Sequence, residues 1–167
     1  GSSRDGRALP RARGGTVITR RTPGREAALQ ILYFWEVGRT QPLSAIESFF
    51  AEHEPDADDE TVAFASRLAL GTIAEVDDLD RVIEQHATHW RIERIAVIDR
   101  LVLRLAVWEL RHERGTPPAV VINEALELAR RFSSDESVRF VNGVLDAIHR
   151  HESAPPEAEA PGPAETD

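Results

Sequence analysis

The chain has 167 residues, 41% of them hydrophobic, so it is long enough to bury a core of its own. It contains no cysteine, which excludes disulfides, thiolate metal sites and cysteine nucleophiles. No apolar run approaches the ~20 residues that cross a bilayer, and the arginine-rich start lacks the apolar stretch of a secretory signal. We therefore expect a soluble, cytoplasmic protein that does not contact a membrane.

Charge is distributed unevenly along the chain. The net charge of −9 by itself argues against a nucleic-acid partner. However, residues 1–25 hold seven arginines and one acidic residue, a net charge of +6, whereas the rest of the chain carries 13 arginines and 28 acidic residues, a net charge of −15. A basic arm on an acidic body suggests two partners, an anionic polymer for the arm and a different partner for the body.

The two ends of the chain lack the apolar periodicity of folded segments. Residues 1–21 combine Gly, Ser, Pro and Arg, and we expect them to form a disordered arginine-rich arm. Residues 152–167 repeat Ala, Pro and Glu without an aromatic or basic residue, and we expect a disordered acidic tail. The folded domain should therefore span residues 22–151.

Within this domain, apolar residues recur at helical spacing, and no segment alternates cleanly over the length of a strand. We expect an all-α fold of about seven helices. In chain order they should occupy residues 22–38, a segment from 42, 58–75, a short segment around 79–83, 95–113, 117–132, and a segment from 133 to about 148.

Several residues are suited to begin these helices, because their side chains can accept hydrogen bonds from free backbone amides or because proline fixes the first turn. Pro23 and Pro117 should occupy first-turn positions. The expected caps are Thr22, Asp58 with Asp59, and Thr116, together with two capping boxes, Ser44 with Glu47 and Ser133 with Glu136.

Three motifs in the second half of the chain resemble the NusB family, in the order and spacing of that family. They are VIDRLVLRLA at 97–106 with EL at 109–110, VINEA at 121–125 with ELA at 127–129, and FVNGVLD at 140–146. Residues 25–33 are similar to the family's first helix, so the resemblance covers about residues 20–149. It implies two stacked three-helix bundles, a first over about residues 22–90 and a second over about residues 93–151.

The resemblance implies a transcription antitermination factor that is not an enzyme and needs no cofactor. Family members pair with the ribosomal protein NusE, and the pair binds the single-stranded boxA element of nascent RNA. The complex joins RNA polymerase with other Nus factors and suppresses premature termination, notably on rRNA operons. Two alternatives stay open: a NusB-like domain of a ribosomal RNA cytosine methyltransferase, and a helical scaffold that self-associates as a homodimer without binding RNA.

Five residues near the N-terminus are candidates for RNA contact: Arg20, Arg21, Arg25, Gln30 and Tyr33. Arginine pairs with phosphate in a bidentate manner, a helix N-terminus favours an anion beside Arg25, and a tyrosine ring can stack on an unpaired base. Each candidate also has a structural alternative. The arginines can form a solvated tail, Tyr33 can pack at the edge of the core, and Gln30 can face water.

The resemblance assigns Asp99, Glu136 and Phe140 to the surface that meets RNA and NusE. Their residue types leave other roles open. Asp99 can form a surface ion pair, Glu136 can be the acid of a capping box, and Phe140 can belong partly to the core.

Asn123, Asn142 and Gly143 lie inside expected helices, where Asn and Gly cost up to about 1 kcal/mol relative to alanine. We expect a structural role that offsets this cost, with buried amides joining helices and a close helix approach at the glycine. His86 and His89 share a helical face, but no third ligand is spaced to complete a zinc site, so no metal is expected.

Overall fold

A computed structural model describes residues 21–154 of the chain. This range forms seven α-helices and one short 3-10 helix and contains no strand, which confirms the all-α prediction. The elements are α1 (Thr22–Gly38), α2 (Pro42–His53), α3 (Asp59–Ala74), α4 (Val76–His86), η1 (Ile92–Arg94), α5 (Val97–His112), α6 (Pro118–Phe132) and α7 (Asp135–Ser153). No described helix has the length and apolarity of a membrane span. Residues 1–20 and 155–167, which hold most of the predicted arm and tail, lie outside the described range.

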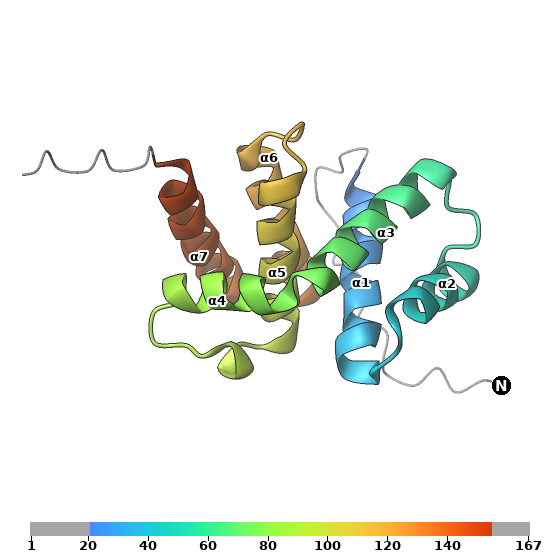
Figure 1. The fold of residues 1–167 in the computed structure, drawn as a ribbon, viewed down its shortest axis with the longest axis horizontal. Coiled ribbons are helices and arrows are strands. Elements are labelled where there is room, and N and C mark those ends of the chain that lie inside the picture. The colour runs from blue at the N-terminus through green and yellow to red at the C-terminus, as the bar shows by residue number, and fades with distance from the viewer. Residues whose placement is uncertain (1–20, 155–167) are drawn as a thin grey trace, which may run out of the picture.

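The helices pack in two groups that meet along α5 (Figure 1). Helices α1, α2 and α3 contact one another, and α1 and α3 also contact α5. Helix α4 follows α3 almost without a break but packs against α5 and α7, whereas the sequence prediction had assigned it to the first group. The second group therefore consists of α4, α5, α6 and α7. The periodicity of α4 in the sequence shows which of its faces is apolar but not which helices cover that face.

Helix α5 is the central element of the molecule. Every residue from 101 to 109 is buried, so this helix is surrounded on all sides and contacts helices of both groups. The buried stretch includes two charged residues, Arg104 and Glu109. Because a buried charge is costly without a partner, each must be matched from a neighbouring helix.

Two helix starts are capped by side chains. The Asp58 carboxylate accepts a hydrogen bond from the Thr61 amide at 2.7 Å, which confirms its predicted place at the start of α3. At α7 the cap is Ser134, whose hydroxyl accepts from the Ser137 amide at 3.1 Å. The prediction of Ser133 with Glu136 as a capping box is therefore wrong by one residue.

The other predicted caps are wrong for a shared reason. Helices α1, α2 and α6 each have a proline in their first turn, and none has a side-chain cap. Proline lacks one of the amides that a cap would satisfy and already fixes a helical φ. The side chains that were expected to cap have other places: Thr22 donates to the Glu124 carboxylate, and Ser44 and Thr116 do not occupy the N-cap positions.

The predicted structural roles of Asn123, Asn142 and Gly143 are also wrong. All three residues are exposed, and a Cβ placed on Gly143 would meet nothing within 4 Å. The close approach occurs instead at Gly71, where a Cβ would lie 2.2 Å from the Trp108 side chain. Sequence position inside a helix does not show which face a residue occupies, and these three residues lie on the solvent side.

Candidate nucleic-acid interface

Arg21 lies where the basic arm joins the body, directly before α1. Its guanidinium is 4.4 Å from the centroid of the Phe64 ring and 3.9 Å from the Glu113 carboxylate, yet 41% of its side chain stays exposed. Arg67 of α3 contacts the same two residues. The arm therefore leaves the body at the C-terminal end of α5, with an arginine that solvent can reach. Arg20 lies outside the described residues.

Arg25 occupies a different environment from Arg21. Only 3% of its side chain is exposed, and its Nε and Nη2 donate to the two carboxylate oxygens of Glu109 at 2.8 and 2.5 Å. Its Nη1 lies 4.0 Å from Glu124. This bidentate pair joins α1 to α5 inside the protein, where a phosphate cannot approach. The placement argues against the predicted RNA contact and favours a role in the fold.

Gln30 and Tyr33 lie about one turn apart on α1, and both are half-buried. Gln30 lines a hollow of about 150 Å³ with Phe49 and Phe50 of α2. Tyr33 packs against the hydrophobic core, as its structural alternative proposed. Both residues keep some exposed surface, but they do not share a site with the other candidates.

Asp99, Glu136 and Phe140 meet in one hollow, which we call the α5–α7 hollow. It has a volume of about 430 Å³ and lies between the start of α5, the start of α7 and the segment that joins α4 to α5. Its lining residues are Trp90, Arg94, Ile95, Ala96, Asp99, Ser134, Glu136, Ser137 and Phe140. The fold thus brings together candidates that are about 40 residues apart in the sequence.

Two aromatic rings stand in this hollow. The Trp90 and Phe140 ring centroids are 6.5 Å apart, with an angle of 70° between the ring planes. Trp90 is 49% exposed, and it is one of four large hydrophobic side chains of the described range that are exposed. The sequence prediction missed Trp90, because it lies outside the helices and so has no periodicity. A tryptophan beside Arg91 and Arg94 in a connecting segment is the signal that could have identified it.

The polar floor of the hollow is a buried carboxylate. Asp99 is 6% exposed, and its Oδ2 accepts a hydrogen bond from the Ser137 hydroxyl at 2.8 Å. Its Oδ1 is buried and has no hydrogen-bond partner in the described part of the chain. Such an acceptor costs about 1–3 kcal/mol while it is unsatisfied. Asp99 is thus not the surface ion pair of its structural alternative.

The rim of the hollow carries charges of both signs. Arg94 and Glu136 are exposed, and Glu136 lies in the first turn of α7, where it is not part of a capping box. No group of three His, Asp or Glu side chains within residues 21–154 is arranged to hold a metal ion. The arrangement offers an aromatic wall, a buried acceptor and one cation, which are groups suited to binding a ligand.

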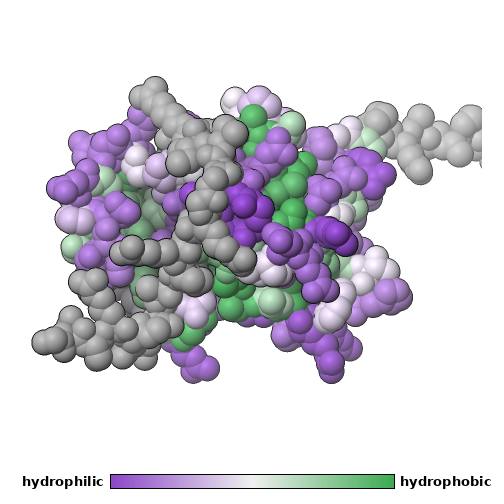
Figure 2. All heavy atoms as spheres, turned by 180° about the vertical axis from the view of Figure 1, so that it is seen from behind, coloured by the Kyte–Doolittle hydropathy of each residue, from purple (hydrophilic) through white to green (hydrophobic). Residues whose placement is uncertain are grey.

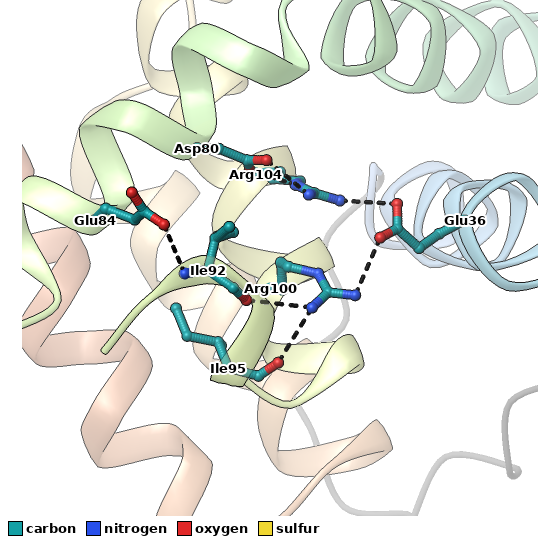
Figure 3. A network of polar contacts seen from close by, with 7 residues as sticks. All are labelled: Glu36, Asp80, Glu84, Ile92, Ile95, Arg100 and Arg104. Atoms are coloured by element: carbon teal, nitrogen blue, oxygen red, sulfur yellow. Dashed lines mark hydrogen bonds and ion pairs between the residues drawn. The ribbon is translucent and has the colours of Figure 1, made fainter. Parts of the chain in front are cut away.

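A polar network holds the segment that forms the rim (Figure 3). The Arg100 Nη1 donates to the carbonyl oxygens of Ile92 and Ile95 at 3.2 and 3.4 Å. From α4, the Glu84 carboxylate accepts from the Ile92 amide at 2.8 Å. The segment between α4 and α5 is therefore fixed from both of its flanking helices, and with it the backbone that carries Trp90 and Arg94.

The same network reaches α1. The Glu36 carboxylate accepts from Arg100 and from Arg104, each at 3.0 Å, while Arg104 also forms a bidentate pair with Asp80 at 2.6 and 2.8 Å. Burial lowers the pKa of Arg104, but the hydrogen bonds and charges of Asp80 and Glu36 outweigh it, and the pKa lies above its ordinary value. Arg104 is therefore a permanent cation that ties the first group of helices to the rim of the hollow.

Known proteins resemble this chain over nearly all of its described range. A model of the NusB family matches residues 22–150. The transcription antitermination protein NusB of Solibacter usitatus is 46% identical over 136 residues, which cover 81% of this chain and 92% of the relative. The protein of the same name from Koribacter versatilis is 45% identical over 130 residues, covering 78% and 88%.

Solved structures agree in fold. NusB of T. maritima matches with a TM-score of 0.73 at 32% identity, covering 80% of this chain and 93% of that one. A crystal structure of antitermination factors NusB and NusE in complex with dsRNA contains a chain that matches with a TM-score of 0.73 at 26% identity, covering 78% and 96%. The match of both sequence and fold shows that this chain belongs to the NusB family.

Proposed function

We propose that this protein is a transcription antitermination factor that pairs with the ribosomal protein NusE and binds single-stranded boxA RNA. The complex joins RNA polymerase with other Nus factors and suppresses premature termination, notably on rRNA operons. The observation that carries the proposal is the α5–α7 hollow. It combines the exposed ring of Trp90 and the half-buried ring of Phe140 with a buried carboxylate, and aromatic rings are the side chains on which unpaired bases stack.

The basic arm supplies the contacts to the phosphate backbone. Arg21 is exposed where the arm meets the body, and four further arginines lie between residues 1 and 15, with Arg20 directly before it. Guanidinium groups bind phosphates without reading the sequence. Helix α5 carries Asp99 in its first turn and ends beside Glu113, so at ~1.5 Å per residue the hollow and Arg21 are roughly 20 Å apart. One strand must span that distance to use both.

The acidic body suits a basic ribosomal protein as the second partner, because complementary charges favour the encounter. Hydrophobic atoms also reach the surface near the middle of the rear face, between hydrophilic residues (Figure 2). The NusB relative that matches in fold is in complex with NusE and dsRNA, which supports the same pairing here. The reported relatives favour an antitermination factor over the methyltransferase domain.

The test is binding of labelled boxA RNA to the full chain, alone and with NusE, against a scrambled RNA across a salt series. We expect NusE to tighten binding selectively for boxA. Each arm contact with a phosphate should add ~0.7 to the slope of log affinity against log salt concentration. A complex with NusE that ignores the RNA sequence, or no complex at all, would contradict the proposal.

Light scattering of the same samples distinguishes the proposed function from the remaining alternative, a self-associating scaffold that does not bind RNA. A homodimer that excludes both NusE and RNA identifies the chain as a self-associating scaffold. A homodimer that NusE converts into a one-to-one complex agrees with the proposed function.

A further inference from the structure

We infer that the N-terminal arm, residues 1–20, docks in a groove between α1, α2 and the start of α3 while RNA is absent, and that RNA must displace it. No described residue lines both this groove and the α5–α7 hollow. The docking itself does not depend on the proposed function, whereas its effect on RNA binding rests on that function.

The groove consists of two adjoining hollows, and we call the two together the α1–α2 groove. Asp58 and Thr61 line both hollows, so they are continuous. Half of the residues that line the larger hollow are proline, alanine or phenylalanine. Three further carboxylates line the groove, Glu26 and Glu54 in the larger hollow and Glu60 in the smaller one. The groove is therefore apolar inside and acidic at its edges.

The arm is attached to the chain directly beside this groove. Arg21, the residue that follows the arm, lines the smaller hollow. An extended chain from Ile18 to Arg21 spans about 10 Å. The last residues of the arm can therefore reach the larger hollow without any change in the described fold.

The charges of the groove and the arm are opposite. Residues 40–66 contain seven acidic residues and no arginine or lysine, and all seven acidic residues are exposed. The arm contains five arginines and one acidic residue, a net charge of +4. Complementary charges favour the contact, and a short tether gives the arm an effective concentration on the order of millimolar. Contacts that are individually weak are then sufficient for docking.

The apolar part of the groove also has a counterpart in the arm. The larger hollow has a volume of about 150 Å³, and a cavity of roughly this size holds a benzene-sized group. Phe50 is half-buried at this hollow and packs edge-on against Phe49, with ring centroids 5.2 Å apart. In the arm, the aliphatic pair at 17–18 lies between Arg13 and Arg20. An aliphatic side chain can thus enter the hollow while the arginines meet the carboxylates around it.

Other occupants fit the groove less well. An RNA phosphate would face Glu26, Glu54 and Asp58, so the groove repels the RNA backbone. A basic segment of another protein has a suitable charge, but it must compete with an arm that is tethered beside the groove. The chain's own arm is therefore the occupant that charge and attachment both favour.

Docking has a consequence for RNA binding. Arginines that pair with groove carboxylates are not available to phosphates, so the apparent affinity for RNA falls with the fraction of chains whose arm is free. Salt screens the docking contacts as well as the RNA contacts. The wild type should therefore show a shallower salt dependence of RNA binding than a variant whose arm is free.

The direct test is limited trypsin digestion of the full chain at low salt without RNA. The rate of cleavage after Arg13 and Arg20, identified by mass, reports the undocked population. Glu54→Gln with Glu60→Gln removes two groove carboxylates and should speed this cleavage about threefold, the effect of losing two exposed ion pairs. Val17→Ser with Ile18→Ser leaves the charge unchanged and should also speed it, because the apolar contact is lost.

The matched control is Asp77→Asn with Asp146→Asn. It removes the same charge from exposed positions of α4 and α7, which lie on the other side of the molecule from α2 (Figure 1). Cleavage of the control should match that of the wild type. An equal acceleration in the control would show that net charge, and not docking in the groove, sets the cleavage rate.

The same proteins are then titrated with boxA RNA and scrambled RNA. The groove variant Glu54→Gln with Glu60→Gln should bind both RNAs about threefold more tightly at low salt, and the gain should disappear at high salt, where the wild-type arm is also free. The control should show no such gain.

The outcomes separate this inference from the proposed function. Equal cleavage rates in the wild type and both groups of test variants overturn the docking, while selective boxA binding would still support the proposed function. No RNA binding by any of the proteins, with or without NusE, contradicts the proposed function, whereas faster cleavage in the test variants still supports docking. Loss of NusE binding in the groove variant with unchanged cleavage shows that a partner protein occupies the groove and overturns the inference.

Discussion

The two ends of α5 present opposite chemistry. At its C-terminal end, Arg21 and Arg67 both lie beside Glu113. At its N-terminal end, Asp99 and the exposed Trp90 line the same hollow, and one carboxylate oxygen of Asp99 is buried without a hydrogen-bond partner in the described residues. One end therefore offers donors to an anion, and the other offers an acceptor and an aromatic face to a base.

This difference corresponds to the two tasks of an RNA-binding protein. Contacts to phosphates supply affinity and position the strand, whereas contacts to base edges supply specificity. The helix between the two ends sets their separation, because it is buried throughout and its charged residues are matched by other helices. The buried pair of Arg25 with Glu109 is part of that middle section.

The largest effect is expected from removing the buried ion pair in the middle of α5. Glu109→Ala leaves Arg25 buried without its bidentate partner, and we expect the free energy of unfolding to fall by about 3–5 kcal/mol. Urea denaturation measures the change. Glu127→Ala is the control, since Glu127 forms a part-exposed pair with Arg130 one turn away and should cost under ~1 kcal/mol. Equal costs for the two variants would show that Arg25 is not a buried structural cation.

A smaller loss of stability is expected from a substitution that affects only the C-terminal half of α5. In Gly71→Ala the new Cβ would lie 2.2 Å from the Trp108 side chain, so one of them must shift, at a cost of about 1–3 kcal/mol. Thermal unfolding measures the loss. The preference for boxA over scrambled RNA should persist, because the hollow lies at the other end of the helix. An altered preference would mean that the two ends are coupled.

Local sequence patterns predict where the helices lie but not which side chains pair between them. Helix positions follow from periodicity, and the starts at Pro42 and Pro118 lie at or within one residue of the expected ones. The role of Arg25 was missed, because its partner Glu109 is 84 residues away and the helical period indicates burial but not pairing. In the sequence, Arg25 lies near other arginines and so was predicted to contact RNA, but in the fold its side chain is buried against Glu109.

The hollow was predictable only in part. The family resemblance supplied Asp99, Glu136 and Phe140, and the fold brings these three together. Trp90 could not be found from helical spacing, because it lies in the connection before η1. The unmatched oxygen of Asp99 depends on which side chains surround it, and no sequence pattern contains that information.

The arm can be tested separately from the hollow. Arg21→Ala removes one exposed cation at the arm's exit, and the slope of log affinity against log salt should become shallower by ~0.7, about fivefold over a tenfold change in salt. Fluorescence anisotropy of labelled RNA measures the slope. The effect should be equal for boxA and scrambled RNA, and a change confined to one of them would contradict a pure phosphate contact.

The smallest effect concerns the helix that carries Phe140. Gly143→Ala places a Cβ in open space on the exposed face of α7 and should stabilise the protein by about 0.5–1 kcal/mol through helix propensity. RNA preference should not change, since Gly143 does not line the hollow. If the variant is less stable than the wild type, another helix does approach Gly143 closely, as the sequence analysis predicted.

The most direct measurement of the division between the two ends uses one RNA pair and three proteins. Wild type, Arg21→Ala and Asp99→Asn are titrated with boxA RNA and scrambled RNA across a salt series. We predict that Arg21→Ala changes the salt slope and leaves the ratio of the two affinities intact, whereas Asp99→Asn changes the ratio and leaves the slope intact. If both variants alter slope and ratio together, the two ends of α5 do not divide affinity from specificity.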